Sequence, residues 1–308
     1  ENEPIILLCN AYLNTTRATL AMTYHQSRTC PAYKPAVKAA TTCSPSLKTT
    51  GHMAFCGILL EVTDPRATSI SSRVAETMIV DSHTHIFPPA FHRDRGKYVT
   101  RDVTLAELFA GAETPMATAQ DLIASMDEAG VDVSVVMGIG WTDMGVAREV
   151  NDYLLESAAR YPKRLVPFCS VNPAWGEEAL REVERCADQG ARGVGEMHPD
   201  TQGFSLSDAS VMEPFIGLLR SLRLVLLTHS SEPVGHEYVG KGTVTPGALM
   251  DLIQRAQDVP IICAHWGGGL PFYALMPEVQ AALQKVYFDS AASPFLYRPR
   301  VYSVAMQL

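Results

Sequence analysis

The sequence predicts an α/β protein, a (β/α)8 barrel that lacks its eighth unit in this chain. From Met78 onward, short apolar runs rich in β-branched residues alternate with longer amphipathic stretches, which is typical of βα units around a parallel sheet. The chain has 308 residues, of which 47% are hydrophobic, so it is long enough to bury a core of this size.

The predicted elements follow one another in order along the chain. Strands are expected at residues 79–85, 131–139, 165–172, 191–198, 224–230, 259–265 and 286–290. Apolar side chains recur at helical spacing in the intervening stretches 119–129, 145–161 and 177–189. The gap after the first strand is expected to be longer and rich in loops, and 298–308 is expected to form a helix.

Seven predicted parallel strands leave two architectures to compare, a barrel and an open sheet. A parallel barrel closes with eight strands, whereas an open doubly wound sheet normally carries a glycine-rich nucleotide loop after its first strand. Here the first strand ends in His83 and His85. We therefore expect a barrel whose eighth strand would begin beyond Leu308.

The composition changes at Met78. Residues 15–50 are rich in Thr, Ser, Ala and Lys without a sustained period of 2 or 3.6, so they offer no face that a helix or strand could bury. We expect residues 1–77 to be a poorly structured N-terminal extension and residues 78–308 to form the incomplete barrel. Whether the extension belongs to the native protein is left open, because Met78 directly precedes the first strand.

Charge and cysteine content limit the partners and the location. Lys and Arg number 25 against 33 Asp and Glu, a net charge of −8, and no basic block is present, so a nucleic acid partner is not expected. No apolar run approaches the roughly 20 residues needed to cross a bilayer, so a membrane is not expected either. The seven cysteines lack CxxC spacing, which favours buried or incidental free thiols in the cytoplasm.

Histidines at the ends of the predicted strands indicate a metal site. His83 and His85 are two residues apart on one strand, so they share a face, and at the carboxyl end of a barrel strand that face lines the active-site mouth. Asp81 shares this face and is expected either to orient an imidazole or to be only a polar strand end. The later strands end in histidines too, namely His198, His229 and His265.

The order of these motifs resembles the amidohydrolase-related family of metal-dependent hydrolases, lactonases and aromatic-acid decarboxylases, over residues 78–308. The matching motifs are DSHTH at 81–85, His229, and AHWGGG at 264–269. The resemblance implies that His83, His85 and His229 bind the metal and that His265 activates water or moves a proton. Members of the family include aminocarboxymuconate-semialdehyde and resorcylate decarboxylases.

The carboxylates Asp289 and Glu196 do not match the aspartate ligand that the family usually supplies. The family usually supplies a further aspartate ligand after the eighth strand, beyond Leu308. Asp289 belongs to the seventh strand, so it is expected to be structural or to lie behind the ligands. Glu196, at the end of the fourth strand, is assigned a catalytic role, with metal binding, substrate orientation and a salt bridge at the rim as alternatives.

The ligand types favour one divalent ion, zinc first and manganese second. His198 and His236 are candidates for contacts behind the ligands or to a small-molecule substrate, although 231–238 also suits an ordinary solvated loop. The three glycines at 267–269 lack the Lys of a phosphate-binding loop, so no nucleotide is expected. The apolar stretches 272–276 and 295–297 are expected in the core, or in a homo-oligomer contact.

These expectations lead to an enzyme whose reaction is not yet fixed. The first hypothesis is a hydrolase that cleaves a C–O or C–N bond of a small carboxylated or cyclic substrate with metal-activated water. The second is a non-oxidative decarboxylase of an aromatic or unsaturated acid on the same site. A hypothesis of another class is an inactive fragment, because a seven-unit barrel leaves two strand edges unpaired.

Overall fold

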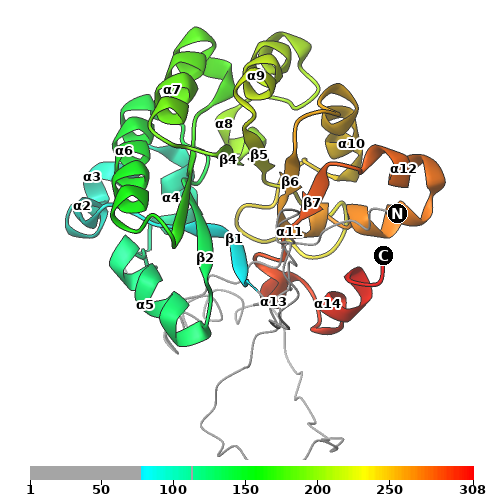
Figure 1. Ribbon diagram of the computed structural model, residues 1–308, viewed down its shortest axis with the longest axis horizontal. Helices are drawn as coiled ribbons and strands as arrows, with labels where there is room; N and C mark the ends of the chain where they lie inside the picture. The colour runs from blue at the N-terminus through cyan, green and yellow to red at the C-terminus, as the bar shows by residue number, and fades with distance from the viewer. Residues whose placement is uncertain (1–77, 112–113) are drawn as a thin grey trace, which may run out of the picture.

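The computed structural model describes residues 78–111 and 114–308, so the predicted extension 1–77 lies outside the described residues. Seven parallel strands form one sheet in the order of the chain, from β1 to β7. The sheet curls, and the helices lie around its outside (Figure 1). The predicted fold class, a parallel α/β barrel lacking one unit, is confirmed.

The strands are shorter than predicted, but each lies within its predicted range. They are β1 (Val80–His85), β2 (Val133–Met137), β3 (Leu165–Cys169), β4 (Gly193–Met197), β5 (Val225–Thr228), β6 (Ile261–Cys263) and β7 (Val286–Phe288). The larger outer helices are α5 (Ala119–Ala129), α6 (Met144–Arg160), α7 (Glu177–Asp188), α9 (Ala209–Leu222), α10 (Pro246–Arg255) and α12 (Pro277–Ala282). Shorter helical segments are α8 (Pro199–Gln202), α11 (Ala264–Gly267), α13 (Ser293–Leu296), α14 (Arg300–Ala305), η1 (Pro173–Trp175) and η2 (Leu270–Leu275).

Helix α5 coincides with its prediction because its ends are well specified. The hydroxyl of Thr118 accepts from the backbone N–H of Asp121, whose carboxylate accepts from the backbone of Thr118 in return, and Gly130 ends the helix at φ 71°. The preceding gap is not the loop that we expected. It holds the short helices α2 (Pro89–Arg93), α3 (Arg95–Val99) and α4 (Val103–Phe109), which are too short to show an apolar period.

The core is divided by the sheet. Apolar side chains fill the layer between the strands and the outer helices, while a smaller cluster fills the inside of the barrel. The inner cluster consists of Val135, Met137, Phe168, Leu227, Ile262 and Ala264. The polar residues near the ends of β1 and β4 and directly after β5 and β6 are thereby left to gather at the carboxyl ends of the strands.

The burial of the cysteines agrees with the sequence prediction, whereas the burial of several apolar residues does not. Cys169, Cys186 and Cys263 are free and buried, as expected. The core prediction is wrong for Leu275, which is 75% exposed because the η2 segment carries it outward, and Phe272, Tyr273, Met276 and Phe295 are exposed as well. A homo-oligomer contact at these residues stays a prediction. Within 78–111 and 114–308, no helix combines the length and apolarity needed to cross a bilayer.

Candidate metal centre

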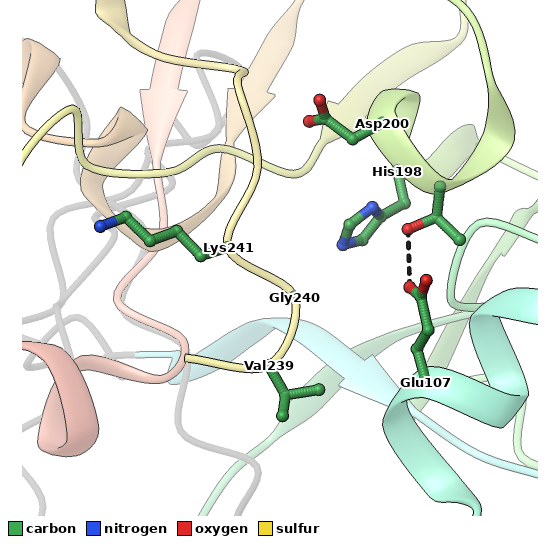
Figure 2. A pocket seen from close by; sticks show the side chains of 7 residues that line it. Glu107, His198, Asp200, Val239, Gly240 and Lys241 are labelled. Carbon is green, nitrogen blue, oxygen red and sulfur yellow. Dashed lines mark hydrogen bonds between the residues drawn. The ribbon is translucent and has the colours of Figure 1, made fainter. Parts of the chain in front are cut away.

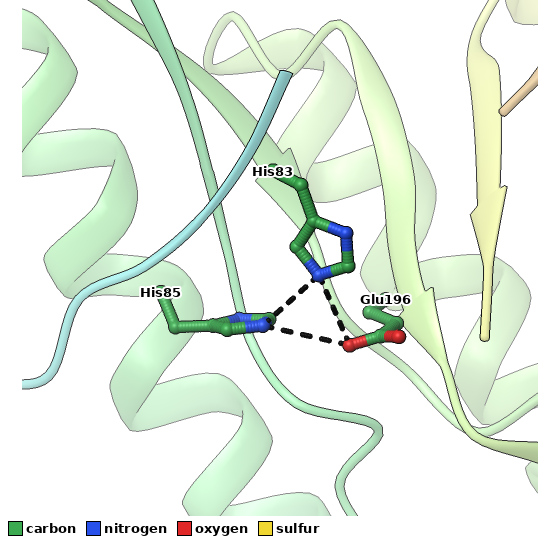
Figure 3. Close-up of side chains that lie close together, drawn as sticks. All are labelled: His83, His85 and Glu196. Carbon is green, nitrogen blue, oxygen red and sulfur yellow. Dashed lines mark hydrogen bonds and ion pairs between the residues drawn. The ribbon is translucent and has the colours of Figure 1, made fainter. Parts of the chain in front are cut away.

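Glu196 lies at the centre of a cluster of imidazoles at the carboxyl ends of the strands. Its Oε2 is 3.2 Å from Nε2 of His83 and 3.5 Å from Nε2 of His85, both on β1 (Figure 3). Its Oε1 is 3.0 Å from Nδ1 of His229 and 3.6 Å from Nε2 of His265. The cluster therefore forms two groups of three possible metal ligands that share one carboxylate.

The structure brings together all the residues that the resemblance assigns to the metal and to proton transfer, but in a different grouping. His83 and His85 share their group with Glu196, whereas His229 lies across the carboxylate and shares its group with His265. The grouping depends on how the strands curl, and this cannot be obtained from their order in the chain. The geometry gives Glu196 a more central place than the sequence suggested.

The hydrogen bonds behind the two β1 histidines fix the direction of their lone pairs. Nδ1 of His83 lies 2.8 Å from Oδ2 of Asp289, and Nδ1 of His85 lies 3.3 Å from the carbonyl oxygen of Met137. Because these oxygens only accept hydrogen bonds, each Nδ1 carries the hydrogen and each Nε2 presents its lone pair to the cluster. The two Nε2 atoms are 3.1 Å apart, so a cation, either a proton or a metal ion, is needed between them.

The spacing of these atoms fits a metal ion. Ligands held by zinc at about 2.0–2.2 Å in a tetrahedral arrangement lie roughly 3.3–3.6 Å from one another. The three distances among His83 Nε2, His85 Nε2 and Glu196 Oε2 are 3.1, 3.2 and 3.5 Å. Two imidazole nitrogens and one carboxylate oxygen are also ligand types that zinc and manganese accept. The residues present therefore fit a divalent ion.

The charges of the cluster support the same interpretation. Burial by itself lowers the pKa of His83, but the nearby carboxylates of Asp289 and Glu196 raise this pKa well above 6.5. Burial would raise the pKa of Glu196, yet the surrounding imidazoles, His83 first, hold it well below 4.5. The pKa of Asp289 is also lowered against the effect of burial, mainly by His83. Two buried carboxylates thus stay ionised and attract a cation.

Asp289, expected behind the ligands, connects the strand β7 to both ends of the cluster. Besides His83, its carboxylate accepts from the backbone N–H groups of His265 and Ala291, each at 3.0 Å. Its own carbonyl accepts from the N–H of Trp266 at 2.8 Å. This one buried residue holds the β1 imidazole and the turn that carries His265.

The turn after β6 holds His265 in an unusual backbone conformation. His265 and Trp266 have φ values of 55° and 58°, a region that non-glycine residues occupy only when the surrounding structure holds them there. A Cβ atom at Gly268 would lie 2.2 Å from the carbonyl oxygen of Ser231, so close approach of the backbone explains a glycine there.

The imidazole of His265 faces the cluster with one nitrogen. Its Nδ1 is 2.8 Å from the carbonyl oxygen of Ala291 and therefore carries the hydrogen, which leaves Nε2 directed at Glu196 and His229. Burial lowers the pKa of His265, but the hydrogen bond and charge of Glu196 raise it above 6.5. A group of this kind can accept or donate a proton near neutral pH.

The remaining candidates lie at different distances from the cluster. Oδ1 of Asp81 accepts from the backbone N–H of His83, while the His83 imidazole is oriented by Asp289. His198 is buried and stacks on His229, with ring centroids 4.2 Å apart, and burial lowers its pKa to about 4. His236 is exposed on its loop against Tyr238. A role of His236 toward substrate stays a prediction.

The sequence did not reveal the oxygens that orient the imidazoles. Two of them, on Met137 and Ala291, are backbone carbonyls, for which no side-chain pattern exists. Ser231 was also missed; its hydroxyl lies 3.3 Å from Nε2 of His229. Its position two residues after that histidine, on the same loop, was the one available signal.

A parallel barrel with histidines and carboxylates gathered at the carboxyl ends of its strands is the architecture of metal-dependent barrel enzymes. The model of the amidohydrolase family matches residues 80–305, and the chain belongs to this family. The family includes metal-dependent hydrolases and decarboxylases, as the sequence motifs indicated. No curated protein matches the chain.

Solved structures of similar fold include two decarboxylases and a hydratase. The 5-carboxyvanillate decarboxylase of Sphingomonas paucimobilis is 14% identical with a TM-score of 0.54, covering 69% of this chain and 80% of its own. A 2,6-dihydroxybenzoate decarboxylase is 17% identical with a TM-score of 0.51 over 74% and 84%. The 4-oxalomesaconate hydratase of Rhodopseudomonas palustris is 17% identical with a TM-score of 0.51 over 75% and 78%. At these identities the likeness concerns the fold.

Proposed function

We propose that this protein is a metal-dependent hydrolase that cleaves a C–O or C–N bond of a small carboxylated or cyclic substrate. One observation carries the proposal: Nε2 of His83, Nε2 of His85 and Oε2 of Glu196 lie as far from one another as the ligands of one metal ion do. These three groups would hold the ion, and His229, on the other oxygen of Glu196, is the candidate for a fourth ligand.

The proposed ion is a single zinc, with manganese as the alternative, because nitrogen and carboxylate ligands suit both. Such an ion polarises a substrate carbonyl and lowers the pKa of a bound water to about 7. Asp289 keeps the hydrogen of His83 on Nδ1, so that Nε2 stays available as a ligand. His265 then takes or returns the proton, because its Nε2 faces the cluster and its Nδ1 is held by a carbonyl.

Metal content is the first test of the proposal. Elemental analysis of the purified full chain should find about one zinc or manganese ion per molecule. The double variant His83→Ala/His85→Ala should lose this ion, while the control His92→Ala, an exposed histidine on α2, should keep it. A folded wild-type chain that holds no ion when zinc and manganese are supplied would contradict the proposal.

His265→Ala separates metal binding from proton transfer. We expect this variant to keep the ion, because His83, His85 and Glu196 are untouched, but to lose most turnover of a lactone or amide found by screening. Positioned proton transfer typically contributes 10²–10⁴-fold, so the loss should be on that order. Full activity in His265→Ala would refute the assignment.

Non-oxidative decarboxylation of an aromatic or unsaturated acid is the second candidate. The observation that favours it is the raised pKa of His265 beside Glu196, because decarboxylation ends with delivery of a proton to carbon and a protonated imidazole can supply it. The two reactions differ in their products. Hydrolysis in ¹⁸O-labelled water places the label in the product, whereas decarboxylation releases CO₂ and incorporates solvent hydrogen.

A further inference from the structure

We infer that Glu196, His229 and His265 form a second, weaker site for a divalent ion, and that an ion bound there stops turnover. The binding of this ion follows from the geometry of the three side chains. Its effect on turnover rests on the proposed function, because it concerns the proton that His265 is proposed to move. The first ion, on the other oxygen of Glu196, is the one that the proposed reaction needs.

The ligand atoms of the second group are spaced like those of the first group. Oε1 of Glu196 is 3.0 Å from Nδ1 of His229 and 3.6 Å from Nε2 of His265, and these two nitrogens are 3.2 Å apart. The corresponding three distances in the first group are 3.1, 3.2 and 3.5 Å. The ligands of one tetrahedral zinc ion lie roughly 3.3–3.6 Å from one another. The second group therefore fits a divalent ion as well as the first group does.

The two groups use different oxygens of one carboxylate. Oε2 of Glu196 faces the β1 histidines, whereas its Oε1 faces His229 and His265. A carboxylate can bridge two divalent ions in this way, and the ions of two-metal sites lie about 3.5–4 Å apart. A second ion therefore does not have to displace the first. With one ion bound, His229 is the candidate for the fourth ligand of that ion, and with two bound it belongs to the second.

His265 presents a lone pair to the second site. Its Nδ1 donates to the carbonyl oxygen of Ala291 at 2.8 Å, so the hydrogen lies on Nδ1 and the lone pair on Nε2. The turn after β6 fixes this direction, because the backbone of His265 has a φ of 55° and its N–H donates to Asp289 at 3.0 Å. A ligand that is already held in place loses little freedom when the ion binds.

Ser231 allows His229 to present a lone pair as well. Ser231 is fully buried, and its hydroxyl accepts from the N–H of Gly242 at 2.9 Å and lies 3.3 Å from Nε2 of His229. A hydroxyl has two acceptor lone pairs, so it can also accept a hydrogen from this Nε2. The lone pair of His229 then lies on Nδ1, which faces Glu196. Metal-binding histidines usually donate their other N–H to an oxygen in this manner.

His198 holds the ring of His229 from one face. The two imidazoles are nearly parallel, at 19°, with centroids 4.2 Å apart. His198 in turn lies at the wall of a cavity of about 410 Å³ between helix α4, helix α8 and the loop after β5 (Figure 2). Because His229 is packed on this face and contacts Ser231 through Nε2, its Nδ1 is directed at the cluster before any ion binds.

The charges make the second site the weaker one. Glu196 and Asp289 supply two buried negative charges among the imidazoles, which balance one divalent ion. A second ion instead meets the positive charge of the first, and two divalent ions about 4 Å apart repel each other even at the dielectric constant of water. We expect the second ion to bind about 100-fold or more weakly than the first. The purified chain should therefore hold about one ion, and the second site should fill only when metal is added.

An ion in the second site occupies the nitrogen that the proposed reaction uses. His265 is proposed to accept and return a proton at Nε2, and the same lone pair would form the bond to the second ion. A nitrogen whose lone pair is bound to a metal cannot take up a proton. Excess zinc should therefore inhibit the protein, although the first zinc ion activates it.

The test begins with zinc titration of the full chain after its metal has been removed with a chelator. Isothermal titration calorimetry should show two binding events of unequal affinity. His265→Ala should keep the first event and lose the second. Ser231→Ala should weaken the second ion about 10- to 100-fold, as loss of a hydrogen-bond partner behind a metal-binding histidine does, and the first ion by less. Ser157→Ala, at a buried serine on the outer helix α6, is the matched control and should change neither event.

Manganese reports whether the two ions share a carboxylate. Two manganese ions bridged by one carboxylate are magnetically coupled, so the electron paramagnetic resonance signal of the singly loaded chain should change to that of a coupled pair when the second ion binds. In His265→Ala the signal of an isolated bound ion should persist. A second ion held elsewhere on the chain would leave that isolated signal in the wild type too.

Turnover is then followed against zinc concentration with a substrate found by screening. Activity should rise as the first ion binds and fall over the concentration range in which calorimetry detects the second. Ser231→Ala should need about 10- to 100-fold more zinc for the same inhibition. Full activity with both sites filled would overturn the inhibitory role.

The outcomes separate this inference from the proposed function. A folded chain that binds neither zinc nor manganese overturns the proposed function and the inference together. A chain that binds one ion only, or that keeps its second ion in His265→Ala, overturns the inference alone. If His265→Ala does not fold, Ser231→Ala decides, because a second ion whose affinity does not change in this variant is not held by His229.

Discussion

Asp289→Asn is the substitution that most directly tests how the cluster is organised. Asp289 is fully buried and accepts three hydrogen bonds: from Nδ1 of His83 at 2.8 Å and from the N–H groups of His265 and Ala291 at 3.0 Å. Asparagine keeps one carbonyl oxygen for the two backbone groups. It presents an NH₂ group to His83, so two donors meet unless the His83 hydrogen moves to Nε2.

That tautomer change gives the expected magnitude. With its hydrogen on Nε2, His83 points a donor instead of a lone pair at the metal position. The lost hydrogen bond involves a charged acceptor and is worth about 1.5–3 kcal/mol, which corresponds to roughly 10- to 150-fold in an equilibrium constant. Partners that orient metal-binding histidines typically contribute 10–100-fold to affinity. We therefore expect zinc to bind Asp289→Asn about 10- to 100-fold more weakly.

The assay is zinc affinity by competition with a chromophoric chelator at fixed pH. The matched control is Asp102→Asn, because Asp102 is another buried carboxylate that accepts backbone N–H bonds, from Leu105, Thr142 and Asp143, at a distance from the cluster. It should lower the stability of the fold without changing zinc affinity. Wild-type zinc affinity in Asp289→Asn would refute the tautomer argument.

Two further predictions concern stability. Gly268→Ala places a Cβ atom 2.2 Å from a backbone carbonyl of the loop after β5, at a φ of 60°, so we expect a loss of more than about 1 kcal/mol in urea unfolding; an unchanged midpoint would contradict this packing. In the metal-free chain, the raised pKa of His83 adds stability that is complete below about pH 6.5 and is lost as pH rises through the folded-state pKa. The lowered pKa of Glu196 adds stability that is present above about pH 4.5 and is lost on acidification, so the metal-free chain should be most stable between these limits. Bound zinc should remove the loss of stability at high pH. Thermal melts at a series of pH values, with and without zinc, measure this effect. A metal-free melting temperature that rises steadily above pH 7 would be incompatible with the charges assigned to the cluster.

The sequence by itself determined the class of fold and the chemistry at the ends of the strands. Alternation of apolar runs with amphipathic stretches depends on local spacing alone, and all seven strands lie within the ranges that it predicted. The spacing of His83 and His85 places both on one face of β1 by geometry that requires no other part of the chain. Helix α5 was predicted to the residue from the helical spacing of its apolar side chains, and the structure shows that its ends are set by capping residues that are local too.

The tertiary structure decided which of these residues meet. That Glu196 lies between the β1 histidines and His265, and that Asp289 orients His83 from β7, depends on the curl of the sheet, which brings strands far apart in the chain to one rim. The cavity beside His198 likewise forms between segments separated by more than a hundred residues, from α4 to the loop after β5. Local spacing fixes the direction of each side chain, but distances between strands come only from packing.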